Sequence, residues 1–225
     1  LRGRGIATFL EWTGGNVFEE RVSVTVSGDG YIEIFSATQA MGQGIVTSYA
    51  QLACDVFKVP LERIRILQGD TDRGNGFGSP GSRSLFTGGT AVRVASEQTV
   101  DKARALAADE LEVGPGDVEY DAGFYKVVGT DRKIDLFTVA ARQQDARITM
   151  DTRTSVEGPT WPNGCHVCEV EITPETGEVE VVAYASVNDV GRVINPMIVV
   201  GQLEGGAVQG LGQALMEQVV YDRES

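Results

Sequence analysis

The chain has 225 residues, of which 42% are apolar and 23% charged, and its formal net charge is −13. This length allows one large or two modest domains, and the acidic balance argues against a nucleic-acid or anionic-membrane surface. No apolar run approaches membrane-spanning length, and three cysteines, which give no disulfide framework, favour a reducing, cytoplasmic compartment.

Alternation and helical spacing predict a mixture of strands and helices. Apolar and polar residues alternate on both sides of Asp29 and Gly30, which is typical of a β-hairpin with a tight turn. Asp135 and Asn195 are suited to cap helices, and Pro196 fits the first helical position. The expected elements are strands over 5–12, 22–26 and 31–35, a helix over 44–57, a strand over 62–70, a Gly- and Ser-rich loop over 71–88, a helix over 88–111, strands near 118–120 and 124–128, a helix from 135, a hairpin over 165–187 with its turn at 175–177, and a last helix from 195.

This order of elements predicts an α+β fold, in which mixed or antiparallel sheets carry helices on one face. We expect two related subdomains, residues 1–145 and 146–225, joined near 145–165. Each runs through a hairpin, a Gly-Gln pair and a helix, a similarity too slight to indicate a duplication. The sequence starts without an initiator Met or a signal-peptide pattern, so we expect both ends to be cut from a longer polypeptide and the second subdomain to be truncated at its C-terminus.

The first candidate site is the Gly42-Gln43-Gly44 stretch, which stands between a predicted strand and a predicted helix. Free backbone N–H groups and the positive end of the helix dipole face outward at such a junction, so it suits an anion. Because the net charge repels anions, local N–H groups and neutral amide or hydroxyl side chains must overcome it. A flexible turn is the alternative interpretation.

The second candidate is the loop GSPGSRS, residues 78–84. Gly78 and Gly81 permit a close backbone approach, and Arg83 offers a planar cation. Ser82 and Ser84, if the backbone is extended, project to one side beside backbone N–H donors, an arrangement that resembles an anion nest. A surface loop without a ligand is the alternative.

Gln202, in the stretch GQLEGG, is the third candidate. A glutamine in the second turn of a helix, flanked by glycines, can offer its amide to a ligand that lies over the helix. It is equally suited to face solvent.

The stretch CHVC, residues 165–168, has the spacing of a zinc or redox pair. The surrounding pattern predicts a strand, in which side chains three residues apart point to opposite faces, so Cys165 and Cys168 cannot bind one ion. His166 is the only histidine and there is no second Cys pair, so we expect core packing and no metal site.

Acid–base chemistry is conceivable at Asp70, Asp72, Asp189 or Glu204, but no carboxylate pair stands out. The stretch GDTDRGNG has some features of a calcium loop. It lacks the twelve-residue spacing and the closing glutamate of that motif.

Four segments together, in their order and spacing, resemble one family. They are MGQGIVTSYAQLA, ILQGDTD…GSPGSRS…GGTAV, PNGCHVCEVEITPETGEVEV and NDVGRVINPMIVVGQLEGGAVQGLGQALMEQ. The family is the molybdopterin-binding large subunit of the xanthine dehydrogenase, aldehyde oxidase and aerobic carbon monoxide dehydrogenase enzymes. The resemblance covers essentially the whole chain and looks closest to the bacterial carbon monoxide dehydrogenase-like branch.

The resemblance implies a molybdenum–molybdopterin cofactor in its cytosine dinucleotide form. It puts cofactor contacts on the Gly-Gln junction, on the serine-bearing loop and on the glutamine of the later GQ-x-EGG element. The residues so implied are Gly42, Gln43, Gly44, Ser79, Gly81, Ser82, Arg83, Ser84 and Gln202.

The resemblance also implies an oxidoreductase, namely the cofactor-binding portion of a molybdenum hydroxylase that oxidises a small substrate such as an aldehyde, a purine or CO. Implied partners are the remainder of the large subunit, an Fe–S subunit and a flavin (FAD) subunit, with no nucleic acid and no membrane. The family's catalytic glutamate lies beyond the last residue of this chain, so no catalytic residue is assigned and the isolated chain is expected to be inactive. The alternatives are a non-catalytic assembly module and a phosphate-ligand-binding module.

Overall fold

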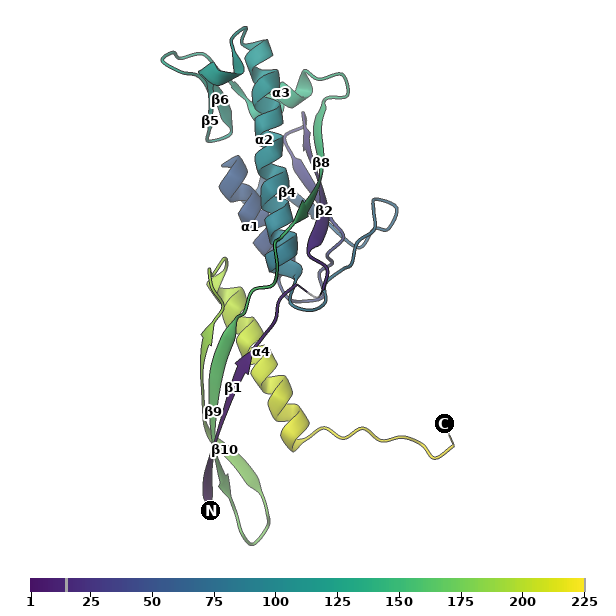
Figure 1. Cartoon of the computed structure of the whole chain (residues 1–225), viewed down its shortest axis with the longest axis vertical. Coiled ribbons are helices and arrows are strands. Elements are labelled where there is room, and N and C mark those ends of the chain that lie inside the picture. Colours follow the sequence, from purple (N-terminus) through teal and green to yellow (C-terminus); the bar gives the residue numbers. More distant parts are fainter. Residues whose placement is uncertain (15, 225) are drawn as a thin grey trace.

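The computed structural model describes residues 1–14 and 16–224, which form an elongated molecule of two parts (Figure 1). The part that we call the core unit consists of β2 (Glu19–Ser27), β3 (Ile32–Ser36), α1 (Ile45–Phe57), β4 (Ile64–Leu67), a π-helical turn (Ser84–Gly89), α2 (Thr90–Glu110), β5 (Val118–Asp121), β6 (Phe124–Val127), β7 (Lys133–Asp135), α3 (Leu136–Ala141) and β8 (Arg147–Ser155), with short 3-10 turns at Leu61–Arg63 and Pro115–Asp117. The part that we call the outer unit consists of β1 (Arg2–Leu10), β9 (Asn163–Ile172), β10 (Val179–Asp189) and α4 (Pro196–Leu215). The expected α+β class is confirmed.

Among the helices of the described residues, none is both long and apolar enough to cross a membrane.

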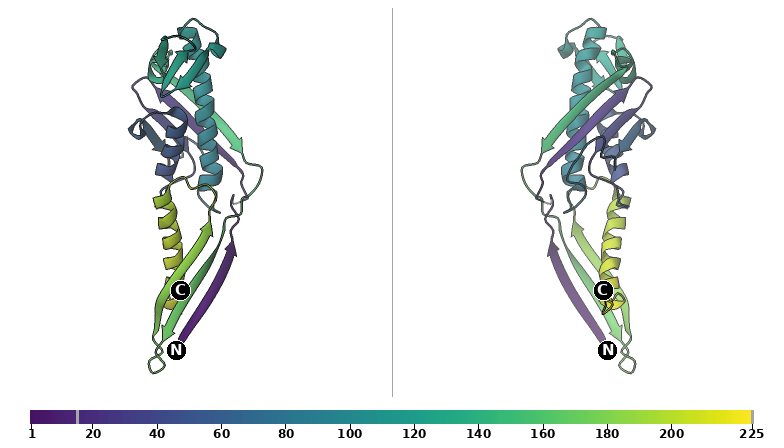
Figure 2. Two further views of the ribbon diagram at one scale, coloured as in Figure 1. Left: turned by 90° about the vertical axis from the view of Figure 1, so that its left-hand side faces the viewer. Right: turned by 90° about the vertical axis from the view of Figure 1, so that its right-hand side faces the viewer.

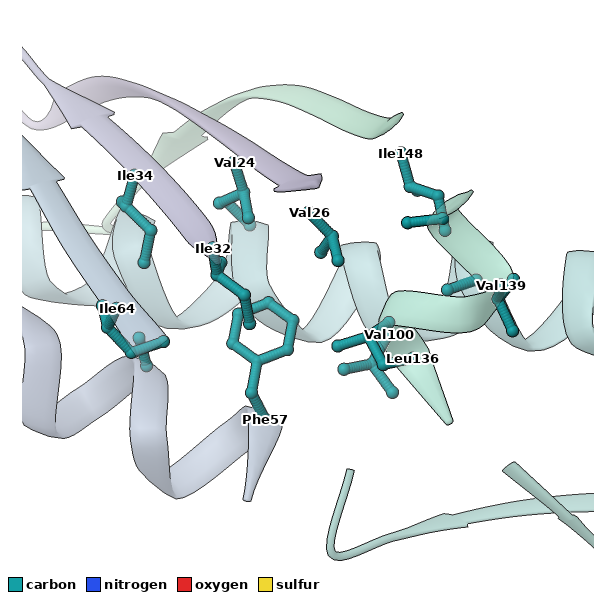
Figure 3. Packing of buried hydrophobic residues seen from close by; sticks show 14 of the residues in the cluster. Val24, Val26, Ile32, Ile34, Phe57, Ile64, Val100, Leu136, Val139 and Ile148 are labelled. Carbon is teal, nitrogen blue, oxygen red and sulfur yellow. The ribbon is translucent and has the colours of Figure 1, made fainter. Parts of the chain in front are cut away.

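The core unit is built on a four-stranded sheet of order β4-β3-β2-β8, in which β3 and β4 are parallel and the other pairs antiparallel. Alternate residues of β2, Val22, Val24 and Val26, have no exposed surface and point to the helices. They pack with Ile34 and Phe57 in one hydrophobic cluster (Figure 3). Because α1 and α2 cover this face, the alternate apolar residues of β2 and β3 are buried in a closed hydrophobic core.

The outer unit is a three-stranded antiparallel sheet of order β1-β9-β10, with α4 along one face (Figure 2). Among the described residues, none in the ranges 1–12 and 153–224 is buried. On the sheet face away from α4, Ile6, Leu10 and Val187 keep 70%, 65% and 78% of their surface exposed. This unit therefore has ordered strands and an ordered helix but no buried core of its own.

The strand pairing crosses the division that we expected between residues 145 and 146. Strand β1 pairs along its whole length with β9, and β8 pairs with β2, so each sheet takes strands from both sides of that boundary. Strand β8 falls within the segment that was expected to be a connection. Pairings between strands more than a hundred residues apart leave no local signal in the sequence, so a division based on chain order does not detect them.

The predicted helix starts and turns are confirmed. Asp135 Oδ1 accepts a hydrogen bond of 3.0 Å from the backbone N–H of Thr138, and Asn195 Oδ1 accepts one of 3.1 Å from that of Ile198. The β9–β10 hairpin turns at Gly177, whose φ is 73°. These signals are local, which is why the sequence shows them plainly.

Candidate functional site

The Gly42–Gly44 stretch is the junction between β3 and α1, as the sequence predicts. Gly42 and Gly44 have φ angles of 98° and 76°, in the left-handed region that favours glycine. No described side chain caps α1 at Gly44, and its first turn carries no acidic residue. The first N–H groups of this thirteen-residue helix and the positive end of its dipole are therefore available to an anionic group.

Gln43 joins this junction to the serine loop. Its Oε1 accepts a hydrogen bond of 2.8 Å from the backbone N–H of Met41, and its Nε2 donates to the carbonyl of Gln39 at 3.1 Å. The same Nε2 also donates to Ser79 Oγ at 3.1 Å. Both the oxygen and the nitrogen of the side-chain amide are thus hydrogen-bonded, and the amide links two of the predicted site segments.

Ser79 and Ser84 continue the chain of hydrogen bonds, because their hydroxyl groups are hydrogen-bonded to each other. Ser84 is the first residue of the π-helical turn that precedes α2, and its carbonyl accepts a 2.6 Å hydrogen bond from the Tyr49 hydroxyl. Burial raises the pKa of Tyr49, which therefore remains a neutral donor. Gln43, Ser79 and Ser84 form one connected polar cluster beside the start of α1.

Ser82 does not join this cluster, which corrects the expectation of an extended loop with serines on one side. Gly81 and Ser82 have φ angles of 58° and 55°, so the backbone turns here and is not extended. Ser82 Oγ donates to Glu11 Oε1 at 2.9 Å, while Ser84 faces Ser79. The left-handed turn at 81–82 therefore directs the two serines to different partners.

Arg83 lies beneath the loop, where it is buried from solvent. Its side chain has no exposed surface, and Nη1 forms a 2.8 Å ion pair with Glu20 Oε2, whose side chain is 1% exposed. In this arrangement the guanidinium is paired and has no surface open to a ligand. The sequence reasoning did not single out Glu20, although Glu20 has the same strand parity as the buried residues Val22 and Val24.

Gln202 lies on α4, apart from the polar cluster. It lines a cavity of about 530 Å³ between α4 and the outer-unit sheet, together with His166, Cys168 and Tyr184. His166 Nδ1 and the Tyr184 hydroxyl are 2.8 Å apart. The structure therefore brings together the first two predicted segments and leaves the third on the neighbouring helix.

The N-terminal ends of α1 and α4 meet, and this contact relates Gln202 to the cluster. A Cβ built on Gly44 would approach Ile198 to 2.8 Å, and Asn195 Nδ2 donates to Gln51 Oε1 at 3.0 Å. Gln202 follows Ile198 by one helical turn, a rise of about 6 Å. The described site is thus a boundary between the core unit and the outer unit, at which the positive ends of two helix dipoles converge.

The strand expected over CHVC is confirmed as β9, with its side chains on alternate faces. Cys168 faces α4, whereas Cys165 lies between Thr8 and Val187 on the opposite face. Cys54, Cys165 and Cys168 are all free. In the part of the chain that the structure describes, no cluster of three His, Cys, Asp or Glu side chains is arranged to hold a metal ion.

Comparison with known proteins decides the family. The profile of the molybdopterin cofactor-binding domain matches residues 1–225. The chain belongs to this family. The resemblance inferred from the sequence motifs is thereby confirmed, and with it the membership of a molybdopterin-binding group.

Several known proteins are similar to this molybdopterin-binding domain over nearly its whole length. The gamma subunit of the 6-hydroxypseudooxynicotine dehydrogenase complex of Paenarthrobacter nicotinovorans is 34% identical over 99% of the chain and 29% of its own length. The large subunit of nicotine 6-hydroxylase from the same organism is 33% identical over 98% of the chain and 30% of its own length. The crystal structure of Cu,Mo-CO dehydrogenase in its carbon monoxide reduced state matches with a TM-score of 0.85 at 29% identity, over 98% of the chain and 30% of that protein chain. The domain therefore spans less than a third of the length of these relatives.

Proposed function

We propose that this chain binds a molybdenum–molybdopterin cofactor, in its cytosine dinucleotide form, at the boundary between the core unit and the outer unit. The observation that carries the proposal is the connected cluster of Gln43, Ser79 and Ser84 beside the uncapped start of α1. An amide, hydroxyls and backbone N–H groups suit a polar pterin and its phosphates at a site where the overall charge repels anions. Family membership supports the same ligand.

Two further observations fit a bound polar group at this place. A Cβ added at Gly42 would meet no described atom within 4 Å, so the junction leaves open space against its backbone. Gln68, whose Nε2 donates to the carbonyl of Thr38, has a buried Oε1 with no hydrogen-bond partner among the described residues. A buried acceptor without a partner is costly unless a ligand or a water satisfies it.

In this proposal the chain holds the cofactor and does not itself carry out the chemistry. Residues Gly42, Gln43, Gly44, Ser79, Gly81, Ser82 and Ser84 contribute from the core unit, and Gln202 contributes from α4. When bound, the cofactor supplies the redox chemistry by which a small substrate is oxidised, while the protein supplies placement and hydrogen bonds. We assign no residue of the chain to a catalytic role.

We further propose that the complete enzyme is a molybdenum hydroxylase whose large subunit includes this domain. Relatives more than three times as long, and named as subunits, support additional polypeptide around it. Exposed apolar faces of the outer unit support the same conclusion, because apolar patches of this kind usually mark contact surfaces. The proposed neighbours are the remainder of the large subunit and Fe–S and flavin subunits that accept the electrons. The three free thiols support a reducing compartment, the cytoplasm.

The experiment measures molybdenum and pterin in the complete polypeptide that contains this domain. Removal of a side-chain amide that binds the cofactor leaves polar cofactor atoms unpaired, at about 1–3 kcal/mol each. We therefore expect Gln43→Ala and Gln202→Ala to lower molybdenum and pterin content while the protein stays folded. Gln209→Ala, on the same helix as Gln202 but outside the cavity that Gln202 lines, is the matched control and should keep full content. Full molybdenum content in both test variants would contradict the proposed site.

A further inference from the structure

Arg83 is a loop residue with the burial of a core residue. Its side chain and that of Glu20 are 0% and 1% exposed, and their charged atoms are 2.8 Å apart. Arginine and glutamate are rarely buried so completely unless they are paired. The position of this pair, directly below the serine loop, requires an explanation beyond general stability.

The guanidinium of Arg83 donates hydrogen bonds to three separate segments of the chain, through backbone carbonyls in two of them and a side-chain hydroxyl in the third. Nε donates to the carbonyl of Val17 at 3.2 Å, and Nη2 donates to that of Glu19 at 2.8 Å, both at the start of β2. Nη1 donates to the carbonyl of Gly78 at 2.8 Å and to Thr38 Oγ1 at 3.4 Å. One planar side chain therefore ties β2 to both the serine loop and the segment that follows β3.

Two of the tied segments, at Gly78 and at Thr38, lie next to the polar cluster in the sequence. Gly78 precedes Ser79, and Arg83 itself precedes Ser84. Thr38 precedes Gln39, whose carbonyl receives the hydrogen bond from Gln43. Gly78 and Thr38, which Arg83 binds, are thus each one residue away from a residue that bonds within or to the cluster.

Glu20 extends the same network on the other side. Ser36 Oγ donates to Glu20 Oε1 at 3.5 Å and accepts a 3.2 Å hydrogen bond from the backbone N–H of Thr38. A buried ion pair is weak as a source of stability, since apolar replacements of similar volume often fold as well. Its directional hydrogen bonds do, however, fix the geometry of the segments that they join.

We propose that Arg83 is a positioning residue, which together with Glu20 holds the loop of residues 78–84 against the Gly42–Gly44 junction before any cofactor binds. The inference rests on the proposed function, because the loop and the junction are the segments assigned to the cofactor. The family resemblance put a direct cofactor contact on Arg83, whereas here Arg83 acts indirectly, by fixing the loop. Pre-formed loops lose less conformational entropy on binding, so the ion pair should raise cofactor affinity without touching the ligand.

The test separates loop order from overall stability. The double variant Glu20→Leu/Arg83→Met replaces the ion pair by apolar side chains. It also leaves the carbonyls of Val17, Glu19 and Gly78 without their donor, so we expect a lower unfolding midpoint in urea for a chain that still folds. In the cofactor-free 225-residue chain, hydrogen exchange of the amides of residues 79–84 should become at least about tenfold faster than any change in the amides of β3 accounts for. In the complete polypeptide, molybdenum and pterin content should fall. Arg21→Met/Asp151→Leu, which removes an ion pair between β2 and β8 at the surface, is the matched control and should change neither reading.

Two results would overturn the proposal. If the double variant keeps slow exchange in the loop and full cofactor content, Arg83 is merely structural. If Arg83→Lys, which keeps the charge but loses the planar fork, retains slow exchange but loses cofactor, Arg83 contacts the ligand directly. The exchange measurement needs no cofactor, so failure of the proposed function, seen as an original protein that binds no molybdenum–pterin, is distinguishable from failure of the positioning role.

Discussion

Ile34 in β3 of the core unit has no exposed surface, whereas Ile6 in β1 of the outer unit keeps 70% of its surface exposed. Both belong to well-formed strands of apolar and polar residues. The difference arises because α1 and α2 cover the core-unit sheet, while the outer-unit sheet has only α4 on one face and nothing described on the other. An alternating strand therefore gains stability from burial only where a second layer covers it. The core unit closes its own hydrophobic core, whereas the outer unit leaves one face of its sheet uncovered.

The matched pair Ile34→Ala and Ile6→Ala in the 225-residue chain tests most strongly whether burial stabilises the core unit and not the outer unit. Ile34→Ala leaves a cavity in a closed core, and we expect it to lower the free energy of unfolding by about 2–5 kcal/mol. Ile6→Ala removes a methyl-rich side chain from solvent, so we expect a change within about 0.5 kcal/mol. Urea denaturation followed by circular dichroism measures both. Equal losses in the two variants would show that the outer unit has a core of its own.

A second prediction concerns Gly44, where the two units touch. Alanine at either Gly44 or Gly42 must adopt a left-handed φ, at about 1–2 kcal/mol. At Gly44 the new Cβ would also lie 2.8 Å from Ile198, whereas at Gly42 it meets no described atom within 4 Å. We expect Gly44→Ala to cost about 1 kcal/mol more than Gly42→Ala, a difference that Ile198→Ala should remove in the double variant. Equal costs without rescue would mean that α4 does not rest on this junction.

A third prediction compares the cysteines of the two units. Cys165→Ala and Cys168→Ala should each cost about 1 kcal/mol or less, since both side chains are only half-buried and lie on opposite faces of β9. Cys54→Ala in α1 is the core-unit counterpart, and burial raises the pKa of its thiol. Metal analysis should find no zinc that depends on Cys165 and Cys168. Stoichiometric zinc that disappears in their double variant would show that this strand is a metal site.

The smallest expected effect is a pH dependence of the outer sheet. Hydrogen bonding to Arg4 holds the pKa of the Glu169 carboxyl below its usual range, and Arg2 adds to the effect. A group whose folded-state pKa is depressed stabilises the fold above its unfolded pKa, about 4, and loses that contribution as the pH falls through the lower folded value. The protection factors of the β1 amides, which correct for the intrinsic exchange rate at each pH, should therefore fall slightly below about pH 4. Glu169→Gln should abolish this extra dependence, and its persistence would assign the effect to another group.

Much of the local structure could be predicted because its signals lie within a few residues. Asp135 and Asn195 cap their helices, Gly177 lies in its turn, and the glycine pair at 42 and 44 marks the strand-to-helix junction. Helix caps favour Asp and Asn, and left-handed backbone favours Gly, so each of these features is marked by the residue at its own position. The segments of the proposed site carry local signals of the same kind, and the family resemblance supplies the ligand that we propose for them.

The roles within the site could not be read in the same way, because they depend on contacts distant in the sequence. Arg83 presents a cation in a polar loop, and only the structure shows it paired with Glu20 of β2. A signal did exist, since Glu20 shares its parity with Val22 and Val24 and an inward-facing glutamate needs a buried cation. The pairing of β8 with β2 and of β1 with β9 left no such trace, so the division into units differs from the one expected.

Hydrogen exchange followed by mass spectrometry, on the 225-residue chain alone and within its complete polypeptide, tests the central claim most directly. We predict that the amides of β2, β3 and α2 are protected to the same degree in both samples. The amides of β1, β10 and α4 should exchange rapidly in the chain alone and become protected in the complete polypeptide, because only there are their apolar faces covered. Strong protection of β1, β10 and α4 in the chain alone would contradict the account, since it would show that the outer unit needs no covering surface.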